Sequence, residues 1–282
     1  MNEVRKPSRI WKLVIWGVIA GALLWSLFPF YWMISTAFKT DLGVFKVPPE
    51  LWPSEVTLEN IRKLFREGSL IPRFFLNSLG TALATVVVTV VLAIFSGYAL
   101  SRLRFRFRSK ILIGVLVTQM FPMVVLLIPL YILYLKAHLL NTWIGLVLAY
   151  TSFALPFGVW MIKGFIDSVP VEMEEAAMID GCSRMGAMIR VVLPGATPGI
   201  VATGIFAFLD AWNNLLFPLT LVNELEMKTL PPGMILYFMG QFRADWGGMM
   251  ATSFLTTIPI VVIFVLVQRY LVAGLTAGAV KG

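Results

Sequence analysis

Long blocks of apolar residues constrain this chain more than any other feature of its sequence. Six blocks run for about 20 residues or more, near 12–37, 72–100, 111–135, 142–163, 195–221 and 249–274. As a helix, each is long enough to cross the roughly 30 Å of hydrocarbon in a bilayer. Only 13% of the 282 residues are charged, against about 25% in a soluble domain. The sequence therefore predicts an all-α integral membrane protein with six transmembrane helices.

A single helical bundle accounts for the whole chain, because the sequence contains no repeat of about 20–50 residues and no long polar linker. We expect an N-terminal tail over 1–11, a transmembrane domain over 12–275 and a C-terminal tail over 276–282. The first block exceeds the apolar core of about 7–15 residues found in signal peptides. It is therefore interpreted as an uncleaved span.

Positive charge sets the expected orientation. The segment 101–110 holds five cations and no acid, and the N-terminus is also basic. Both features are typical of cytoplasmic segments, and six spans then place both termini in the cytoplasm. The segment 39–73 departs from this pattern, since it carries six cations on what would be the outer face.

Several function classes are disfavoured by composition. The net charge of +8 is explained by cytoplasmic loops facing anionic lipid, so we expect no nucleic-acid partner. A single cysteine, Cys182, excludes an internal disulfide or a cysteine-cluster metal site, and a single histidine, His138, disfavours a zinc site. The pattern G-x-x-x-x-G-K-[ST] is absent, so any ATPase must be a separate subunit.

The polar segment 166–194, between the fourth and fifth blocks, carries helix-start signals. Ser168 is the expected N-cap of a first helix, and Pro170 suits its first turn. Gly181 permits the backbone turn at which this helix ends, and a second short helix is expected over 183–192. The result would be a helix-turn-helix along the membrane face.

The first of these helices offers a surface for another protein. Ala176 and Ala177 keep one side free of bulk, and carboxylates stand beside them. Such a side permits close approach and offers hydrogen-bond acceptors.

The same segment matches a known pattern of Glu-Ala-Ala, three residues, Gly, nine residues, and then aliphatic-x-Leu-Pro. The matching residues are Glu175, Ala176, Ala177, Gly181, Val191, Leu193 and Pro194. This spacing resembles the EAA loop of ABC importer permeases. Further segments, at 118–122, 211–213, 268–270 and 274–278, are similar to the smaller permease of maltose-type carbohydrate transporters, so the resemblance covers nearly the whole chain.

The resemblance implies a permease subunit of an ATP-driven, binding-protein-dependent importer of a mono-, di- or oligosaccharide in a bacterial plasma (inner) membrane. Its implied partners are a second, related permease subunit forming a heterodimer, a dimeric cytoplasmic ABC ATPase that holds ATP and Mg, and an extracytoplasmic solute-binding protein. This chain would hold no cofactor and no catalytic site. The implied contacts with the ATPase are Glu174, Glu175, Ala176, Ala177, Asp180, Gly181, Leu193 and Pro194.

Polar residues inside the spans are candidates for the translocation path. Asp210 lies about 22 Å along a helix from Gly195, deep enough that an ionised carboxylate is costly. Asn213 and Asn214 share its helix face. The candidate path residues are Gln119, Asp210, Trp212, Asn213 and Asn214. The alternative is that these groups hold helices or subunits together.

The segment 238–248 resembles the scoop loop of the same family, which inserts into the binding protein. Its candidate residues are Gly240, Gln241, Phe242, Arg243, Asp245 and Trp246. The alternative is a re-entry turn with an interfacial tryptophan.

Two other functions remain as competitors. An ion-coupled secondary transporter would need ion sites at the membrane midplane, usually in repeated halves, and no repeated halves appear. A membrane enzyme would need clustered acid-base or metal-ligating groups, and the spans offer one acid.

Overall fold

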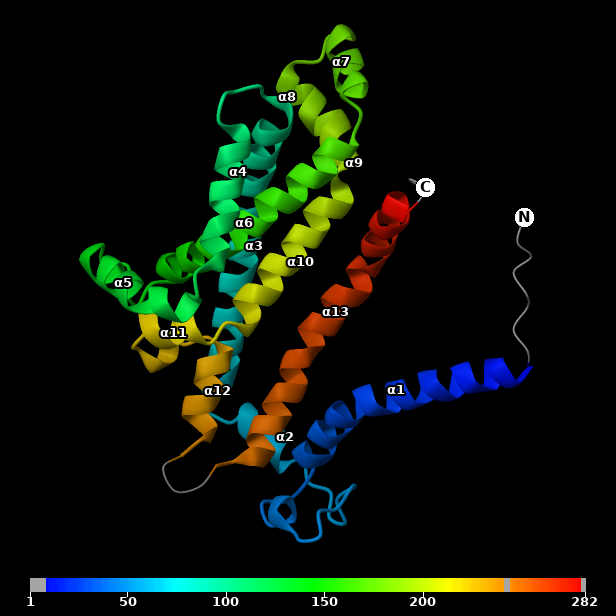
Figure 1. Ribbon diagram of the computed structural model, residues 1–282. Helices are drawn as coiled ribbons and strands as arrows, with labels where there is room; N and C mark the ends of the chain where they lie inside the picture. The colour runs from blue at the N-terminus through cyan, green and yellow to red at the C-terminus, as the bar shows by residue number, and fades with distance from the viewer. Residues whose placement is uncertain (1–8, 241–243, 280–282) are drawn as a thin grey trace. The chain divides into compact units, whose positions relative to one another are not determined.

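The protein is almost entirely helical in the computed structural model, which describes residues 9–240 and 244–279, with side chains through 268 (Figure 1). Within those ranges the only strand-like pairings are two isolated bridges, Lys39 with Val56 and Met239 with Ala244. The all-α prediction is confirmed. The chain forms two compact units: Met1–Ser69 with Tyr237–Thr257, here the first unit, and Leu70–Leu236 with Ile258–Gly282, the second unit.

The first unit contains one long helix, two short helices and parts of two helices that cross its boundary. Its elements are α1 (Arg9–Ala37), η1 (Gly43–Phe45), α2 (Glu59–Leu64) and the start of α13 (Trp246–Ala279), which continues into the second unit.

The second unit contains most of the helices. They are α3 (Ile71–Arg102), α4 (Arg108–Val117), η2 (Thr118–Met120), α5 (Met123–Lys136), α6 (Trp143–Ser168), α7 (Val171–Ile179), α8 (Arg184–Ala187), the π-helical η3 (Met188–Val192), α9 (Leu193–Gly195), α10 (Thr197–Asn213), α11 (Leu216–Leu221), η4 (Leu225–Met227) and α12 (Leu230–Phe238), whose last two residues belong to the first unit.

Four described helices, α1, α3, α6 and α13, are long and apolar enough to cross a membrane. Two bent pairs raise the number to six if each counts as one span. One pair is Arg108–Met120 with Met123–Lys136, bent by 100°, and the other is Arg184–Gly195 with Thr197–Asn213, bent by 77°.

The third apolar block is therefore not the single helix expected over 111–135. The chain is extended at Phe121 (ψ 128°) and Pro122 (ψ 123°). Proline supplies no backbone N–H and disfavours helical geometry in the residue before it, so the helix ends there and α5 restarts at Met123.

The fifth block, expected over 195–221, is also interrupted. α10 ends at Asn213, and Asn214 is extended, with ψ 122°. The side-chain oxygen of Asn214 accepts a hydrogen bond from the backbone N–H of Phe217 at 3.1 Å. Such side-chain bonding to the backbone competes with continued helix, and α11 begins as a new helix at Leu216.

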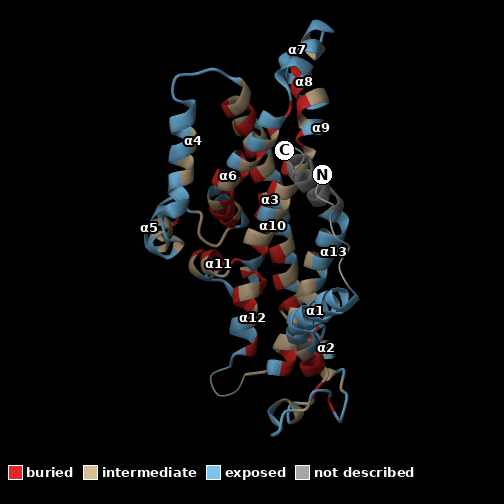
Figure 2. Ribbon diagram, turned by 45° about the vertical axis from the view of Figure 1, so that its right-hand side comes forward, coloured by how far each residue is buried: buried red, intermediate tan, exposed pale blue. Residues whose placement is uncertain are grey.

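The core of the second unit lies where α3, α6 and α10 pack together, and buried residues gather along these three helices (Figure 2). Two glycines allow the close approach of α10 to α6. A Cβ on Gly158 would lie 2.9 Å from the Thr203 methyl group, and a Cβ on Gly199 would lie 2.4 Å from Cδ2 of Phe165. Small residues of this kind let transmembrane helices pack backbone to backbone.

Replacing Gly199 with alanine is expected to destabilise the protein, although alanine favours helix. The added methyl group overlaps Phe165 down to its Cβ, at 2.8 Å, and such overpacking costs about 1–3 kcal/mol. Gly204→Ala is the matched control on α10, because its Cβ would meet Val86 at an ordinary 3.6 Å. Thermal unfolding in lipid nanodiscs should show a lower midpoint for Gly199→Ala alone; equal midpoints would contradict the packing.

The first unit is held by a buried asparagine between the end of α1 and α2. Nδ2 of Asn60 donates to the carbonyl oxygens of Ala37 at 3.0 Å and Lys39 at 2.8 Å. At the start of α2, Oγ1 of Thr57 accepts a hydrogen bond from the backbone N–H of Glu59 at 3.1 Å. The segment between α1 and α2 is thereby fixed to both helices.

Candidate coupling and translocation sites

The helix predicted in the segment 166–194 is α7, but its start differs from the prediction. Ser168 is not the N-cap: it is the last residue of α6, and its hydroxyl donates to the carbonyl of Phe165 at 2.7 Å. Pro170 occupies the N-cap position instead, and its carbonyl accepts from the N–H of Met173. With its hydroxyl committed to α6, Ser168 has no role in starting α7.

The end of α7 agrees with the sequence. Gly181 has φ +93°, a conformation that glycine adopts without strain, and its N–H donates to the carbonyl of Met178. Oγ of Ser183 then caps α8 by accepting from the N–H of Gly186 at 3.1 Å. The helix predicted over 183–192 is confirmed as a continuous helical stretch, although it is π-helical over Met188–Val192.

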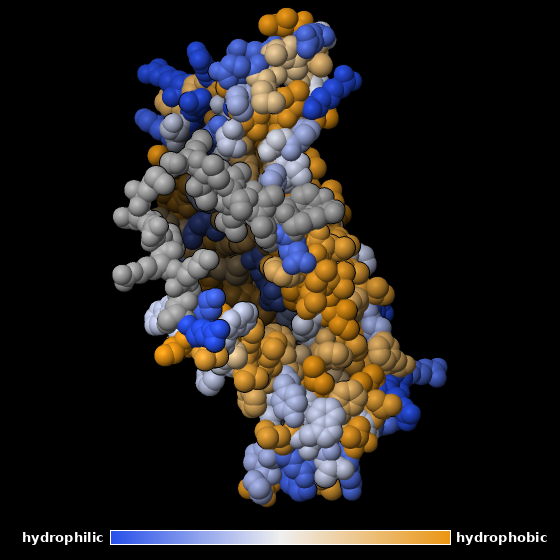
Figure 3. Space-filling model, turned by 90° about the vertical axis from the view of Figure 1, so that its right-hand side faces the viewer, coloured by the Kyte–Doolittle hydropathy of each residue, from blue (hydrophilic) through white to orange (hydrophobic). Residues whose placement is uncertain are grey.

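The outward side of α7 is exposed, and hydrophilic side chains gather over the end of the second unit that carries α7 and α8 (Figure 3). Glu175, Ala176 and Asp180 are exposed there, and Ala177 is partly buried. Ile179 is 86% exposed, although the sequence pattern did not single it out. An exposed aliphatic side chain beside small residues and carboxylates suits a protein interface.

Glu174 faces the other way, which corrects its predicted role as a contact with a partner. Its side chain is 4% exposed and forms an ion pair with Nε of Arg102 at 2.8 Å. The hydroxyl of Tyr98 also donates to the Glu174 carboxylate. The three residues Tyr98, Arg102 and Glu174 are named the anchor below, because they hold α7 to the end of α3.

Arg102 extends the anchor to α6. Its Nη2 donates to the carbonyl oxygens of Ile166 at 3.0 Å and Val169 at 2.7 Å. From the sequence, Arg102 was only one of five cations in a basic segment. The signal that distinguishes it is its place in the last turn of a span, whereas Arg104 and Arg106 lie beyond that helix.

The remaining predicted residues of this segment lie at the bend into α10. Leu193 is partly buried and packs against the core of the second unit, so it positions α9 rather than forming a free surface. Pro194 and Gly181 are exposed.

An open cavity of about 410 Å³ lies in the second unit, where α10 ends beside α11 and the start of α5. Its lining residues are Met123, Phe206, Leu209, Asp210, Asn213, Asn214, Leu215 and Leu216. The structure thus brings together three of the five predicted path residues. Oδ2 of Asp210 is buried and has no hydrogen-bond partner within the described part of the chain.

The other two predicted path residues lie elsewhere. Trp212 is 3% exposed, stacks on Phe208 with ring centroids 5.4 Å apart, and meets Phe75 edge-on at 5.5 Å. Its ring packs into the core of the second unit, so Trp212 does not line the cavity that holds Asp210. Gln119 donates to the Phe153 carbonyl at 2.7 Å and ties the break after α4 to α6.

The predicted scoop loop is described only in part, because Gln241, Phe242 and Arg243 lie outside the described residues. Its base is closed by the bridge between Met239 and Ala244. Gly240, which is exposed, follows Met239.

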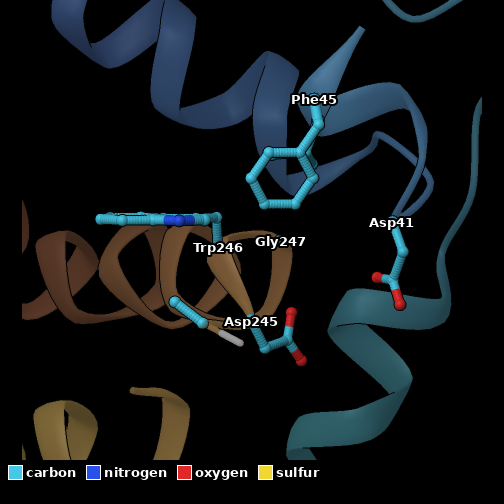
Figure 4. Close-up of a pocket in the computed structure, with 7 residues that line it drawn as sticks. Asp41, Phe45, Asp245, Trp246 and Gly247 are labelled. Atoms are coloured by element: carbon cyan, nitrogen blue, oxygen red, sulfur yellow. The ribbon is translucent and has the colours of Figure 1, made fainter. Parts of the chain in front are cut away.

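A pocket of about 130 Å³ lies at this base, within the first unit. Phe45 and Trp246 stand on one side of it, and the carboxylates of Asp41 and Asp245 lie toward the other (Figure 4). Nζ of Lys63 lies 3.5 Å from Asp41 and 3.3 Å from Asp245.

Asp245 has a second task, which is to start α13. Its Oδ1 accepts from the N–H of Gly248 at 2.8 Å, and its own N–H donates to the carbonyl of Phe238 at 2.9 Å. Asp245 therefore links the end of α12 to the start of α13 at the base of the loop.

Comparisons with known proteins agree on one family. The family described as "Binding-protein-dependent transport system inner membrane component" matches residues 89–277. The diacetylchitobiose uptake system permease protein DasC of Streptomyces coelicolor is 39% identical over 275 residues, which are 98% of each chain. The trehalose transport system permease protein SugB of Mycobacterium tuberculosis is 37% identical over 274 residues, 96% of this chain and 98% of the relative.

A third relative and a solved structure extend the agreement. The trehalose/maltose transport system permease protein MalG of Thermococcus litoralis is 35% identical over 271 residues, 96% of each chain. A crystal structure of a bacterial ABC transporter that imports the acidic polysaccharide alginate has the same fold, with a TM-score of 0.81 over 95% of this chain and 99% of that chain at 19% identity. This chain therefore belongs to the family of inner-membrane permease components of binding-protein-dependent ABC transport systems.

Proposed function

We propose that this chain forms half of the translocation path of an ATP-driven sugar importer and docks through α7 onto a dimeric cytoplasmic ABC ATPase. A second, related permease subunit completes the path, and an extracytoplasmic solute-binding protein delivers the solute. The sugar class is supported by the solutes in the names of three relatives, which are diacetylchitobiose, trehalose and maltose. The alternative of an ion-coupled secondary transporter finds no support among them.

The observation that carries the proposal is the two-sided character of α7. One side is fixed, since the buried Glu174 is bound by Arg102 and Tyr98 of α3. The other side is open, with Glu175 and Ile179 exposed. A short helix that is bonded to the bundle on one side and exposed on the other is suited to transmit the movement of a bound partner to the bundle.

In this proposal the ATPase pair holds ATP and Mg, and this chain carries no cofactor. Closure of the pair on ATP moves the docked α7 helices of the two permease subunits. The anchor passes that movement to α3 and α6, because Arg102 bonds to both α7 and the end of α6. The cavity of the bundle then turns outward, and hydrolysis resets it. Both termini of the chain lie in the cytoplasm in this arrangement.

The outer partner is proposed to meet the first unit. Asp245 and Trp246 line a pocket at the base of the loop 238–248, which suits a contact with the solute-binding protein. The aromatic and charged walls of this pocket are of the kind found in interfaces that combine an apolar centre with polar contacts.

Charge reversal on the open side of α7 tests the docking. In the co-purified complex in lipid, Glu175→Lys is expected to lower binding-protein-stimulated ATP hydrolysis about tenfold or more, since a reversed interfacial charge costs upward of about 1.4 kcal/mol. Glu224→Lys is the control, because Glu224 is an exposed acid elsewhere in the second unit. Normal assembly, hydrolysis and import by the Glu175→Lys complex would refute docking through α7.

A further inference from the structure

The connection between α3 and α4 presents positive charge without a counter-charge. It spans residues 103–110, all of which are exposed, and is named the basic turn here. Its four cations are Arg104, Arg106, Arg108 and Lys110. None of the ion pairs among the described residues includes one of these cations, and the first turn of α4 contains no acid. The basic turn therefore offers four positive charges to a partner outside the chain.

The other cation-rich segment, 39–73, shows that this lack of pairing is specific to the basic turn. Four of its six cations form ion pairs with carboxylates, and these are Lys46, Lys63, Arg66 and Arg73. A fifth, Lys39, is buried and donates to the Glu50 carbonyl at 2.7 Å. Charge that the fold does not compensate within itself marks a surface suited to an anionic partner.

Aromatic side chains alternate with the cations of the basic turn. Phe105 is 40% exposed and Phe107 is 50% exposed. The Arg106 guanidinium lies 5.5 Å and the Lys110 ammonium 5.7 Å from the centre of the Phe107 ring. Exposed rings beside cations suit the boundary of a bilayer, because the rings can enter the acyl region while the cations reach the phosphates.

The helices on both sides place the basic turn at a membrane surface. α3, which ends at Arg102, is long and apolar enough to cross a membrane, and so is the bent pair that begins at Arg108 if it counts as one span. No residue of α4 is buried, and its exposed Ile111 and Ile113 continue the apolar surface of the turn. The basic turn is therefore expected at the level of the lipid headgroups.

A protein partner fits the basic turn less well than lipid does. The turn lies at the end of the second unit that carries α7 and α8 (Figure 1). The open side of α7 is acidic there, since Glu175 and Asp180 are exposed. A protein surface that suits the carboxylates of α7 would repel the cations of the turn if it covered both.

We propose that the basic turn binds the headgroups of anionic phospholipids, with its cations at the phosphates and its two phenylalanine rings among the upper acyl carbons. A cluster of four or more cations directly beside a membrane span is the pattern that attracts anionic lipid. The bound lipid would lie one residue beyond Arg102 of the anchor. This ligand goes beyond the proposed import function, and its binding requires neither solute nor ATP.

Photo-crosslinking in proteoliposomes of equal parts phosphatidylglycerol and phosphatidylcholine tests the proposal on the whole complex. Benzoylphenylalanine replaces Phe105 and keeps an aromatic ring there, and the masses of its adducts identify the lipid. The wild-type turn is expected to give phosphatidylglycerol adducts in excess. Arg104→Gln with Arg106→Gln should lower the ratio of phosphatidylglycerol to phosphatidylcholine adducts about tenfold or more, because each cation near an anionic surface changes affinity about fivefold.

Two control pairs separate local charge from other effects. Arg104→Lys with Arg106→Lys keeps the charge and should keep the adduct ratio. Arg62→Gln with Lys136→Gln removes two exposed cations outside the turn and should also leave the ratio unchanged. If the complex with both glutamines at 104 and 106 does not assemble, Arg106→Gln alone is expected to lower the ratio about fivefold.

Three results would overturn the lipid surface. They are a wild-type ratio near one, an unchanged ratio in the glutamine variants, and an adduct with the ATPase subunit in place of lipid, which would make the turn a protein contact. The importer function is tested separately, by hydrolysis and import. If those fail while the adduct ratio behaves as expected, the function is wrong and the lipid surface stands.

Discussion

Replacing Arg102 with methionine is expected to lower the unfolding midpoint of the protein by about 10 °C and to uncouple ATP hydrolysis from import. The substitution leaves the Glu174 carboxylate buried with only Tyr98 as a partner. It also removes the donor for the carbonyls of Ile166 and Val169. Breaking one side of a buried ion pair costs about 3–5 kcal/mol, and each kcal/mol lowers the midpoint by about 2–4 °C in a chain of this size.

The control for this prediction is the paired substitution Arg102→Met with Glu174→Leu. Removing both charges avoids the stranded carboxylate, so the double variant should be more stable than Arg102→Met alone. It should still import poorly, because α7 is no longer tied to α3. If the Arg102→Met variant is as stable as wild type and couples ATP hydrolysis to import equally well, the anchor neither holds α7 nor transmits its movement.

Lys228→Met has the second largest expected effect on stability. The helix that it is expected to destabilise is α11, which lies beside the cavity. The Lys228 side chain is buried, and its ammonium group donates to the carbonyls of Pro218 at 3.2 Å, Leu219 at 3.4 Å and Val222. Methionine keeps the length of the side chain but strands those carbonyls at the end of α11. Because hydrogen bonds from a charged donor are worth about 1.5–3 kcal/mol each, a loss of about 3 kcal/mol or more is expected.

Lys136→Met provides the comparison for Lys228→Met, since Lys136 also stands at a helix end but is exposed. The midpoint of thermal unfolding of Lys136→Met should stay near that of wild type, because substitutions at exposed positions change stability by about 0.5 kcal/mol or less. Equal midpoints for the two variants would contradict the capping role of Lys228.

The parts of the fold that follow from composition and turn chemistry could be predicted. Apolar blocks set the helical class, and Gly181 and Ser183 mark the turn and the second helix after α7 because only local backbone geometry is involved. The interruptions at Pro122 and Asn214 were missed, because apolar character is the same on both sides of each break. Pro122 was nevertheless a readable signal, since proline disfavours continued helix.

The orientation of side chains could not be predicted, because it depends on partners far away in the chain. Glu174 and Glu175 are neighbours with the same charge, yet one is buried against Arg102 and the other is exposed. Arg102 and Glu174 are 72 positions apart in the sequence, and no local signal indicates their pairing. The chemistry of Trp212 suggests a place in the path, but its packing against Phe75 and Phe208 shows that its ring points into the core.

The contact between α7 and an ATPase is the central claim, and site-specific photo-crosslinking in the native membrane tests it most directly. A photoreactive amino acid would replace Ala176, which is exposed on α7, or Leu42, which is 83% exposed in the first unit. The account predicts an adduct with the ATPase subunit from position 176 and none with it from position 42. An ATPase adduct from position 42 and none from position 176 would contradict both the docking surface and the proposed orientation of the chain.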